Sequence, residues 1–153
     1  MVAVGGSKEV VHARPGDYHI ILKNRKGFVK LAIQTGTSLV PVFAFGENDI
    51  YDQPVAPDGS LLKNIQAFLK SFSGITPPII NGRGFFQHSF GLVPRSNRIT
   101  TVVGAPIDIV KNETPTIKQI DDVHEQFVMK LTKLFNDQKI KHSDNSSLKL
   151  IIE

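Results

Sequence analysis

Short apolar segments rich in β-branched residues alternate along the chain with segments whose apolar residues recur every three or four positions. Strand-like segments occupy residues 19–22, 38–45 and 98–103, whereas residues 25–36 and a long segment that begins near residue 114 have helical spacing. Strands that alternate with helices are typical of α/β domains. The sequence therefore predicts an α/β fold with a mixed or mainly parallel sheet and flanking helices.

The first predicted helix begins near Arg25. Phe28, Leu31 and Ala32 follow helical spacing, and Gly36 stands where a helix takes a left-handed cap. The sequence thus predicts both this helix and the residue that ends it.

Two further helices are expected. Thr114 or Thr116 can cap the longer one. Its apolar positions are Ile120, Val123, Phe127, Leu131, Leu134 and Phe135. Residues 60–72 form the other, with Ser60 as cap, and we expect a core-facing helix in preference to a membrane-surface helix.

Several strand and turn positions can be predicted individually. Pro41 lacks an N–H, so it must lie at a sheet edge, at a bulge or at the start of a strand. The first four residues, from Met1 to Val4, are predicted to be the end of a buried parallel strand, so we expect the chain to start in the middle of a domain. Residues 142–153 are predicted to be a polar tail, in which the apolar residues 148–152 have no assigned role.

Composition and motifs narrow the classes of function. The 153 residues suit one domain, and the net charge of +4 is compatible with an anionic ligand. Because the basic residues are scattered and no RNA-binding or zinc-finger pattern occurs, we expect no nucleic-acid partner. The chain has no cysteine, and its five histidines match no zinc pattern, so no metal site is expected. No apolar run is long enough for a membrane-spanning helix.

Four cations gather around the start of the first predicted helix: Lys23, Arg25, Lys26 and Lys30. Cations are unfavourable at the amino end of a helix unless an anion is bound there. The backbone amides of that end, together with Arg25 and Lys26, could hold a phosphate. The alternative is that the long side chains simply extend into water.

Two glycine motifs could also contact a ligand. Gly5 and Gly6 could let a substrate approach the backbone, with Glu9 offering a carboxylate, although the spacing alone favours a solvated loop acid. Gly82 and Gly84 flank Arg83, which could grip a carboxylate or phosphate or simply mark an exposed turn.

Seven blocks of the sequence occur in an order known from one family. The longest run from Leu22 to Ala32 and from Leu39 to Asp49, and the others comprise residues 4–9, 13–16, 82–84, 89–94 and 99–104. In these blocks the chain resembles the type-2 diacylglycerol acyltransferase family, which includes monoacylglycerol acyltransferases and is related to the glycerolipid acyltransferases. The resemblance covers essentially residues 2–141, and it implies a glycerolipid-acyltransferase-like fold with residues 1–141 as the carboxyl-terminal part of the domain.

The resemblance implies transfer of a fatty acyl group from acyl-CoA to the hydroxyl of a mono- or diacylglycerol, at the cytosolic face of the endoplasmic reticulum membrane or at a lipid droplet. Acyl-CoA would be a co-substrate, and no permanently bound cofactor is expected.

The catalytic residue of the family has no counterpart in the sequence. In the family, a histidine of a His-Pro-His-Gly block acts as the general base. That block does not occur in these 153 residues, and the family resemblance places it upstream of Met1. We therefore expect the amino-terminal part of the domain to be missing, no catalytic residue to lie within the chain, and the chain to be inactive by itself.

Binding residues carry over from the resemblance position by position. They are Gly5, Gly6, Glu9, Arg25, Lys26, Gly27, Phe28, Lys30, Pro41, Phe45, Gly46, Glu47, Asn48, Gly82, Arg83 and Gly84. The family match gives no individual roles, but a CoA phosphate suits the block around Arg25. The alternatives are a truncated, non-catalytic isoform that binds acyl-CoA or lipid, and an unrelated α/β phosphate-binding protein. The sequence does not decide between a monoacylglycerol and a diacylglycerol acceptor, or whether the protein forms a homo-oligomer.

Overall fold

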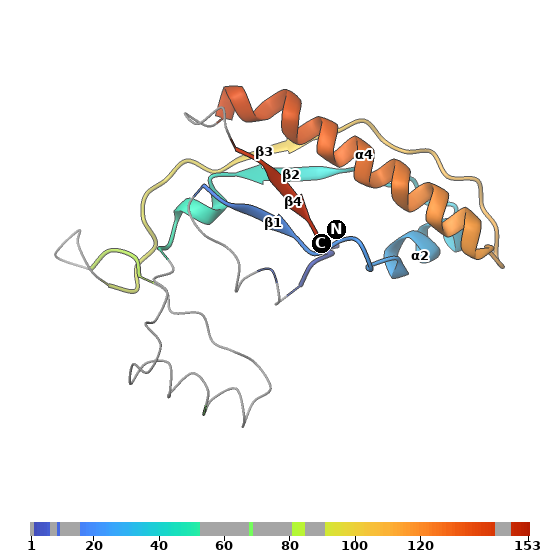
Figure 1. Ribbon diagram of the computed structural model, residues 1–153, viewed down its shortest axis with the longest axis horizontal. Coiled ribbons are helices and arrows are strands. Elements are labelled where there is room, and N and C mark those ends of the chain that lie inside the picture. The colour runs from blue at the N-terminus through green and yellow to red at the C-terminus, as the bar shows by residue number, and fades with distance from the viewer. Residues whose placement is uncertain are drawn as a thin grey trace.

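The computed structural model describes residues 2–6, 9, 16–52, 68, 81–84, 91–142 and 148–153. Figure 1 shows the elements in chain order. They are β1 (Tyr18–Ile20), α2 (Gly27–Thr35), β2 (Val42–Phe45), the 3-10 helix η1 (Glu47–Asp49), β3 (Thr100–Val103), α4 (Ile117–His142) and β4 (Leu150–Ile152). The α/β class predicted from the sequence is confirmed.

The described strands form two separate pairs instead of one sheet. β1 lies parallel to β4, with Tyr18 opposite Leu150, and β2 lies antiparallel to β3, with Val42 opposite Val103. Aromatic rings fill the space between the pairs, since the Tyr18 ring centroid is 5.5 Å from that of Phe43. The two pairs therefore meet through side chains and share no backbone ladder.

The beginning of the chain differs from the sequence prediction of a buried strand over residues 1–4. Met1 lies outside the described residues, so the prediction is tested from Val2 onward. Residues 2–6 form no strand, and Val2 is exposed, because no described strand lies beside them to form a ladder. The strand prediction is therefore wrong for the described part of this segment.

The end of the chain also differs from the prediction. The segment predicted to be a polar tail contains β4, and Leu148 is buried in the core. The apolar residues of this segment complete the parallel pair with β1.

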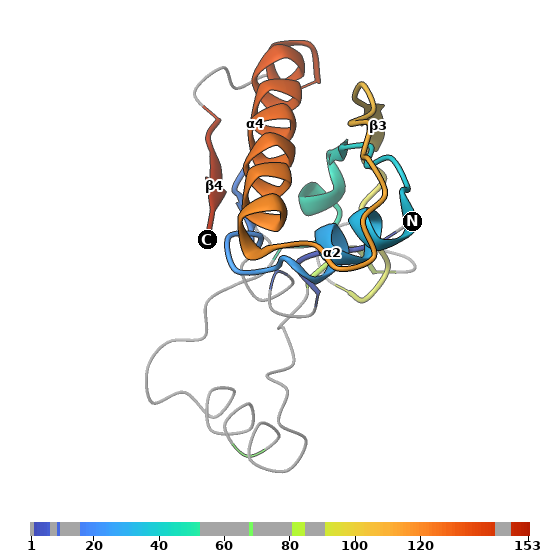
Figure 2. The same cartoon turned by 90° about the vertical axis from the view of Figure 1, so that its right-hand side faces the viewer.

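Helix α4 supplies the largest part of the described core. Its buried residues, His124, Phe127, Leu131 and Phe135, recur at steps of three and four. Phe135 is fully buried and stacks on Phe45, with ring centroids 5.6 Å apart. Figure 2 shows β4 on one side of α4 and β3 on the other, so one helix joins the two strand pairs.

The ends of both helices follow the sequence expectations. Gly36 caps α2 with a left-handed φ of 68°. Thr116 caps α4, because its Oγ1 accepts the Gln119 N–H at 3.2 Å while Gln119 Oε1 accepts the Thr116 N–H at 3.0 Å. This reciprocal pair is a capping box.

Two details refine the remaining predictions. Pro41 immediately precedes β2, so its missing N–H interrupts no ladder, and its carbonyl accepts the Gly104 N–H at 2.8 Å. The helix predicted over residues 60–72 lies outside the described residues apart from Phe68. Among the helices that the structure describes, none combines the length and apolar character that a membrane crossing requires.

Candidate functional site

Among the described residues, no side chain caps the amino end of α2. Lys26 is the cap residue and makes no capping hydrogen bond, and the first turn contains no acidic residue. The first helical bond runs from the Lys30 N–H to the Lys26 carbonyl at 3.1 Å. The amides of Gly27, Phe28 and Val29 therefore point out of the helix end. A Cβ added at Gly27 would meet no atom of the described residues within 4 Å, so there is free space beside the first residue of α2.

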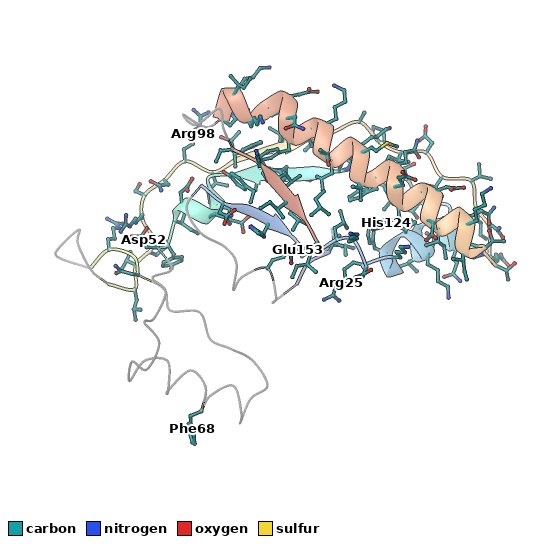
Figure 3. All side chains as sticks on the ribbon, in the orientation of Figure 1. Arg25, Asp52, Phe68, Arg98, His124 and Glu153 are labelled. Atoms are coloured by element: carbon teal, nitrogen blue, oxygen red, sulfur yellow. The ribbon has the colours of Figure 1, made fainter. Side chains whose placement is uncertain are left out.

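The four cations predicted at this end are not equivalent. Lys26 Nζ lies 2.7 Å from Asp121 Oδ1 of α4, so a carboxylate of the protein already compensates its charge. The side chains of Lys23, Arg25 and Lys30 are exposed. Figure 3 shows Arg25 beside α2 at the edge of the molecule. Arg25 precedes the cap residue and Lys30 follows it by four residues, so both place exposed positive charge near the start of α2.

The Glu9 side chain forms a hydrogen bond with the segment that connects β1 to α2. Its Oε1 accepts the Ile21 N–H at 2.7 Å. Its carboxyl group fills the space beside Gly5, where a Cβ would lie 1.6 Å from Glu9 Cδ. Gly6 closes this turn with a left-handed φ of 66°, and its carbonyl accepts the Glu9 N–H. The predicted Gly5, Gly6 and Glu9 therefore form one local unit against the connection.

Burial and nearby charges shift the pKa of the Glu9 carboxyl. Burial raises its pKa above the ordinary value of 4.5, and the nearby charge of Glu47 raises it further. The Ile21 N–H and the charge of Arg25 lower the pKa, but burial outweighs them. The fold thus brings together Glu9, Arg25 and Glu47, which the sequence analysis named from three separate blocks.

Residues of α4 hold α2 and its connection in place. His124 is buried, and its Nε2 lies 3.0 Å from the Leu22 carbonyl oxygen. The Phe28 ring meets Phe127 edge to face at 5.2 Å. His124 and Phe28 are therefore structural contacts, and the aromatic ring of Phe28 is directed into the core.

Sequence reasoning missed two of these contacts. His124 lies three residues before Phe127, so the helical spacing of the core positions could have indicated that it is buried. Asp121 reaches Lys26 across 95 residues of chain. No sequence signal indicates that ion pair.

The predicted residues around β2 support the strand and its turn. Pro41 and Phe45 are buried in the core. Gly46 has a φ of 83°, and a Cβ there would lie 2.3 Å from the Arg98 carbonyl oxygen. The Asn48 side-chain amide donates to the Asp17 carbonyl at 2.6 Å. Of the predicted residues around β2, Glu47 therefore belongs to the candidate site. The others support the strand and the turn that follows it.

The Gly82–Arg83–Gly84 motif lies elsewhere. Arg83 forms an antiparallel bridge with Val93, and a Cβ on Gly82 would lie 2.1 Å from the Val93 carbonyl oxygen. Arg83 Nε donates to the Pro94 carbonyl at 3.2 Å. This motif is at the opposite end of the molecule from α2 (Figure 1). The structure therefore does not bring Arg83 to the cations around α2.

The catalytic base expected from the family resemblance is not among the residues of this site. The resemblance places that histidine upstream of Met1, and Met1 itself lies outside the described residues. The position of the histidine stays a prediction, and the site built around α2 is a candidate for binding alone.

Metal ligands are not grouped in the part of the chain that the structure describes. There, no three His, Cys, Asp or Glu side chains are arranged to hold a metal ion.

Comparison with known proteins identifies the relatives of the chain. The sequence model of the family "Diacylglycerol acyltransferase" matches residues 1–153. Diacylglycerol O-acyltransferase 2 of Dictyostelium discoideum is 49% identical over 146 residues, which cover 95% of this chain and 44% of that protein. No solved structure matches the chain.

Two animal proteins show similar coverage. 2-acylglycerol O-acyltransferase 1 of Mus musculus is 45% identical over 93% of this chain and 42% of its own length. Diacylglycerol O-acyltransferase 2 of Danio rerio is 44% identical over 99% of this chain and 42% of its own length. The chain thus spans less than half of each of these relatives, and it belongs to the diacylglycerol acyltransferase family.

Proposed function

We infer that this chain supplies the coenzyme A-binding part of an acyl-CoA-dependent acylglycerol acyltransferase. The observation that carries the proposal is the amino end of α2, where Arg25 and Lys30 are exposed and no side chain of the described residues caps the first-turn amides. Coenzyme A carries a diphosphate and a ribose phosphate. A helix amino end with cations beside it suits such an anion, because the amides donate and the partial positive charge attracts.

The family membership supports the chemistry of the whole reaction. The hydroxyl oxygen of a mono- or diacylglycerol would attack the thioester carbonyl carbon, so that a C–O bond forms and the C–S bond breaks. A general base takes the hydroxyl proton, and the coenzyme A sulfur leaves as a thiolate that is then protonated. The base that the family uses belongs to a His-Pro-His-Gly block, which these 153 residues do not contain. We therefore assign them binding without turnover.

The names of the relatives support both a diacylglycerol and a monoacylglycerol as acceptor. A lipid acceptor requires the enzyme to work at a membrane or lipid-droplet surface. We expect the protein that contains this chain to be found at the endoplasmic reticulum or on lipid droplets.

Calorimetric titration with coenzyme A tests the proposed site. The variant Arg25→Gln with Lys30→Gln should bind about tenfold more weakly than the natural chain, a difference of about 1.4 kcal/mol. The matched control is Arg98→Gln with Lys141→Gln, which removes the same charge from two exposed side chains outside the site. Figure 3 shows Arg98 far from Arg25. The control should keep the natural affinity.

Two outcomes would contradict the proposal. Equal weakening by both double variants would mean that overall charge, and not the α2 end, attracts coenzyme A. Acyl transfer from labelled acyl-CoA by the 153-residue chain would show that a base is present within it.

A further inference from the structure

Glu9 lies beside the proposed coenzyme A site without being suited to bind its phosphates. A carboxylate repels a phosphate, and the Glu9 Oε1 already accepts the Ile21 N–H at 2.7 Å. Ile21 is the first residue after β1 and begins the connection, residues 21–26, that carries Arg25 to the start of α2. Glu9 therefore contacts the segment that presents the cation.

Among the described residues, three groups outside the connection hold the backbone of Ile21, Leu22 and Lys23. The Ile21 N–H is held by Glu9, the N–H groups of Leu22 and Lys23 both donate to the Glu153 carbonyl at 2.8 and 2.7 Å, and the Leu22 carbonyl meets His124. Of these three groups, Glu9 also acts electrostatically on Arg25. A hydrogen bond to a charged acceptor is stronger than one between neutral groups, so Glu9 is well placed to fix this connection.

Gly5 makes this contact sterically feasible. The Glu9 carboxyl occupies the volume of the missing side chain, since a Cβ on Gly5 would overlap Cδ, Oε1 and Oε2 of Glu9 at 1.6 to 2.2 Å. Gly5 itself is buried. Any larger residue at position 5 would push the carboxyl away from Ile21.

We propose that Glu9, cradled by Gly5, is a positioning residue that holds the β1–α2 connection and thereby sets Arg25 for coenzyme A. Its role is to accept the Ile21 N–H, and its negative charge is not required by the ligand. This inference rests on the proposed function of the α2 end.

Two replacements of Glu9 separate these roles. Glu9→Gln keeps a side-chain oxygen for the Ile21 N–H, whereas Glu9→Ala removes it. In coenzyme A titrations, Glu9→Ala and Gly5→Ala should each weaken binding by roughly three- to tenfold, the usual net effect of one hydrogen bond. Glu9→Gln should bind at least as tightly as the natural chain. Amide hydrogen exchange at Ile21 should be faster in Glu9→Ala and Gly5→Ala than in Glu9→Gln, whose neutral amide oxygen still accepts the N–H, although more weakly than the carboxylate.

A double-mutant cycle tests the link between the two residues. In a chain that already carries Glu9→Ala, the further change Gly5→Ala should have little effect on coenzyme A affinity, because the carboxyl that it displaces is gone. Additive losses would overturn the proposed contact. The natural affinity in Glu9→Ala, or an equal loss in Glu9→Gln and Glu9→Ala, would overturn the positioning role.

The outcomes also separate this inference from the function on which it rests. If the natural chain does not bind coenzyme A, both fall. If binding depends on Arg25 and Lys30 but not on Glu9, the proposed site stands and the positioning role falls.

Discussion

The two helices of the described fold begin in opposite ways. α4 begins with a reciprocal cap, in which Thr116 and Gln119 satisfy one another's N–H groups. α2 begins at Lys26, whose side chain makes no capping hydrogen bond, and the exposed cations Lys23, Arg25 and Lys30 lie within four residues of it in the sequence. Residues near α4 complete the start of that helix, whereas the start of α2 keeps donors and positive charge available. The comparison indicates that α4 acts as the scaffold, and it supports the proposal that the end of α2 meets a ligand.

The scaffold role of α4 predicts the largest effect. Phe135 is fully buried and contacts Tyr18, Phe43 and Phe45. Phe135→Ala should lower the free energy of unfolding by about 3–5 kcal/mol, because it removes buried area and leaves a cavity. Denaturant unfolding measures this loss. Met129→Ala, at an exposed position of the same helix, should cost less than about 0.5 kcal/mol. Similar losses in the two variants would refute the scaffold role.

The capping box of α4 predicts a smaller, purely structural effect. Thr116→Ala should lower the free energy of unfolding by about 1 kcal/mol, since the Gln119 N–H loses its acceptor. Coenzyme A affinity should be unchanged. Thr114→Ala is the matched control, because Thr114 is the neighbouring threonine that the sequence also allows as a cap. Thermal or denaturant unfolding measures both variants. If Thr114→Ala lowered the free energy of unfolding more than Thr116→Ala, the assignment of Thr116 as the cap would be wrong.

A side-chain cap introduced at the start of α2 should make this helix begin as α4 does and should weaken coenzyme A binding. Lys26→Ser places a hydroxyl acceptor at the cap position, where it competes with a phosphate for the first-turn amides. The unfolding free energy should change by less than about 1 kcal/mol, because the new cap offsets the loss of an exposed ion pair. Coenzyme A binding, measured by calorimetry, should weaken by roughly three- to tenfold.

Asp121→Asn is the control for Lys26→Ser. It breaks the same ion pair with Lys26 but leaves the first-turn amides free. Coenzyme A should bind this variant at least as tightly as the natural chain. If Lys26→Ser binds coenzyme A normally, the first-turn amides do not contact the ligand.

The smallest effect concerns pH. Burial raises the pKa of Glu9 above 4.5, although the charge of Arg25 opposes the shift and that of Glu47 adds to it. As pH rises from about 4.5 through the raised pKa, the folded chain holds a proton that the unfolded chain has lost. The free energy of unfolding should therefore decrease across this interval, and Glu9→Gln should remove that decrease. Urea unfolding at several pH values compares the two. If the free energy of unfolding increased with pH in the natural chain but not in Glu9→Gln, the raised pKa of Glu9 would be contradicted.

Local patterns predicted the helices well. The apolar spacing located α2 and α4, Gly36 marked the left-handed cap, and Thr116 was one of two candidates for the start of α4. Each of these features depends on residues close together in the sequence. The buried face of α2 is nevertheless Val29, Ala32 and Ile33, while Leu31 is exposed, because contacts with distant elements decide which side of a short helix is covered.

Long-range pairing could not be read from the sequence. β4 pairs with β1 across more than a hundred residues, and nothing in residues 148–152 names that partner. For the candidate site, the sequence and the family resemblance named Glu9, Arg25, Lys26 and Glu47. The ion pair of Lys26 with Asp121 and the bond from Ile21 to Glu9 arise from tertiary packing, which charge and spacing alone do not encode.

The most direct test of the central claim observes the two helix starts while coenzyme A is added. In amide NMR spectra of the isotope-labelled chain, the signals of Gly27, Phe28 and Val29 should shift in proportion to coenzyme A bound. Those of Ile117, Lys118 and Gln119, at the capped start of α4, should stay in place. Binding that leaves the three α2 signals unmoved, or that moves the α4 signals equally, would contradict the assignment of the α2 end as the coenzyme A site.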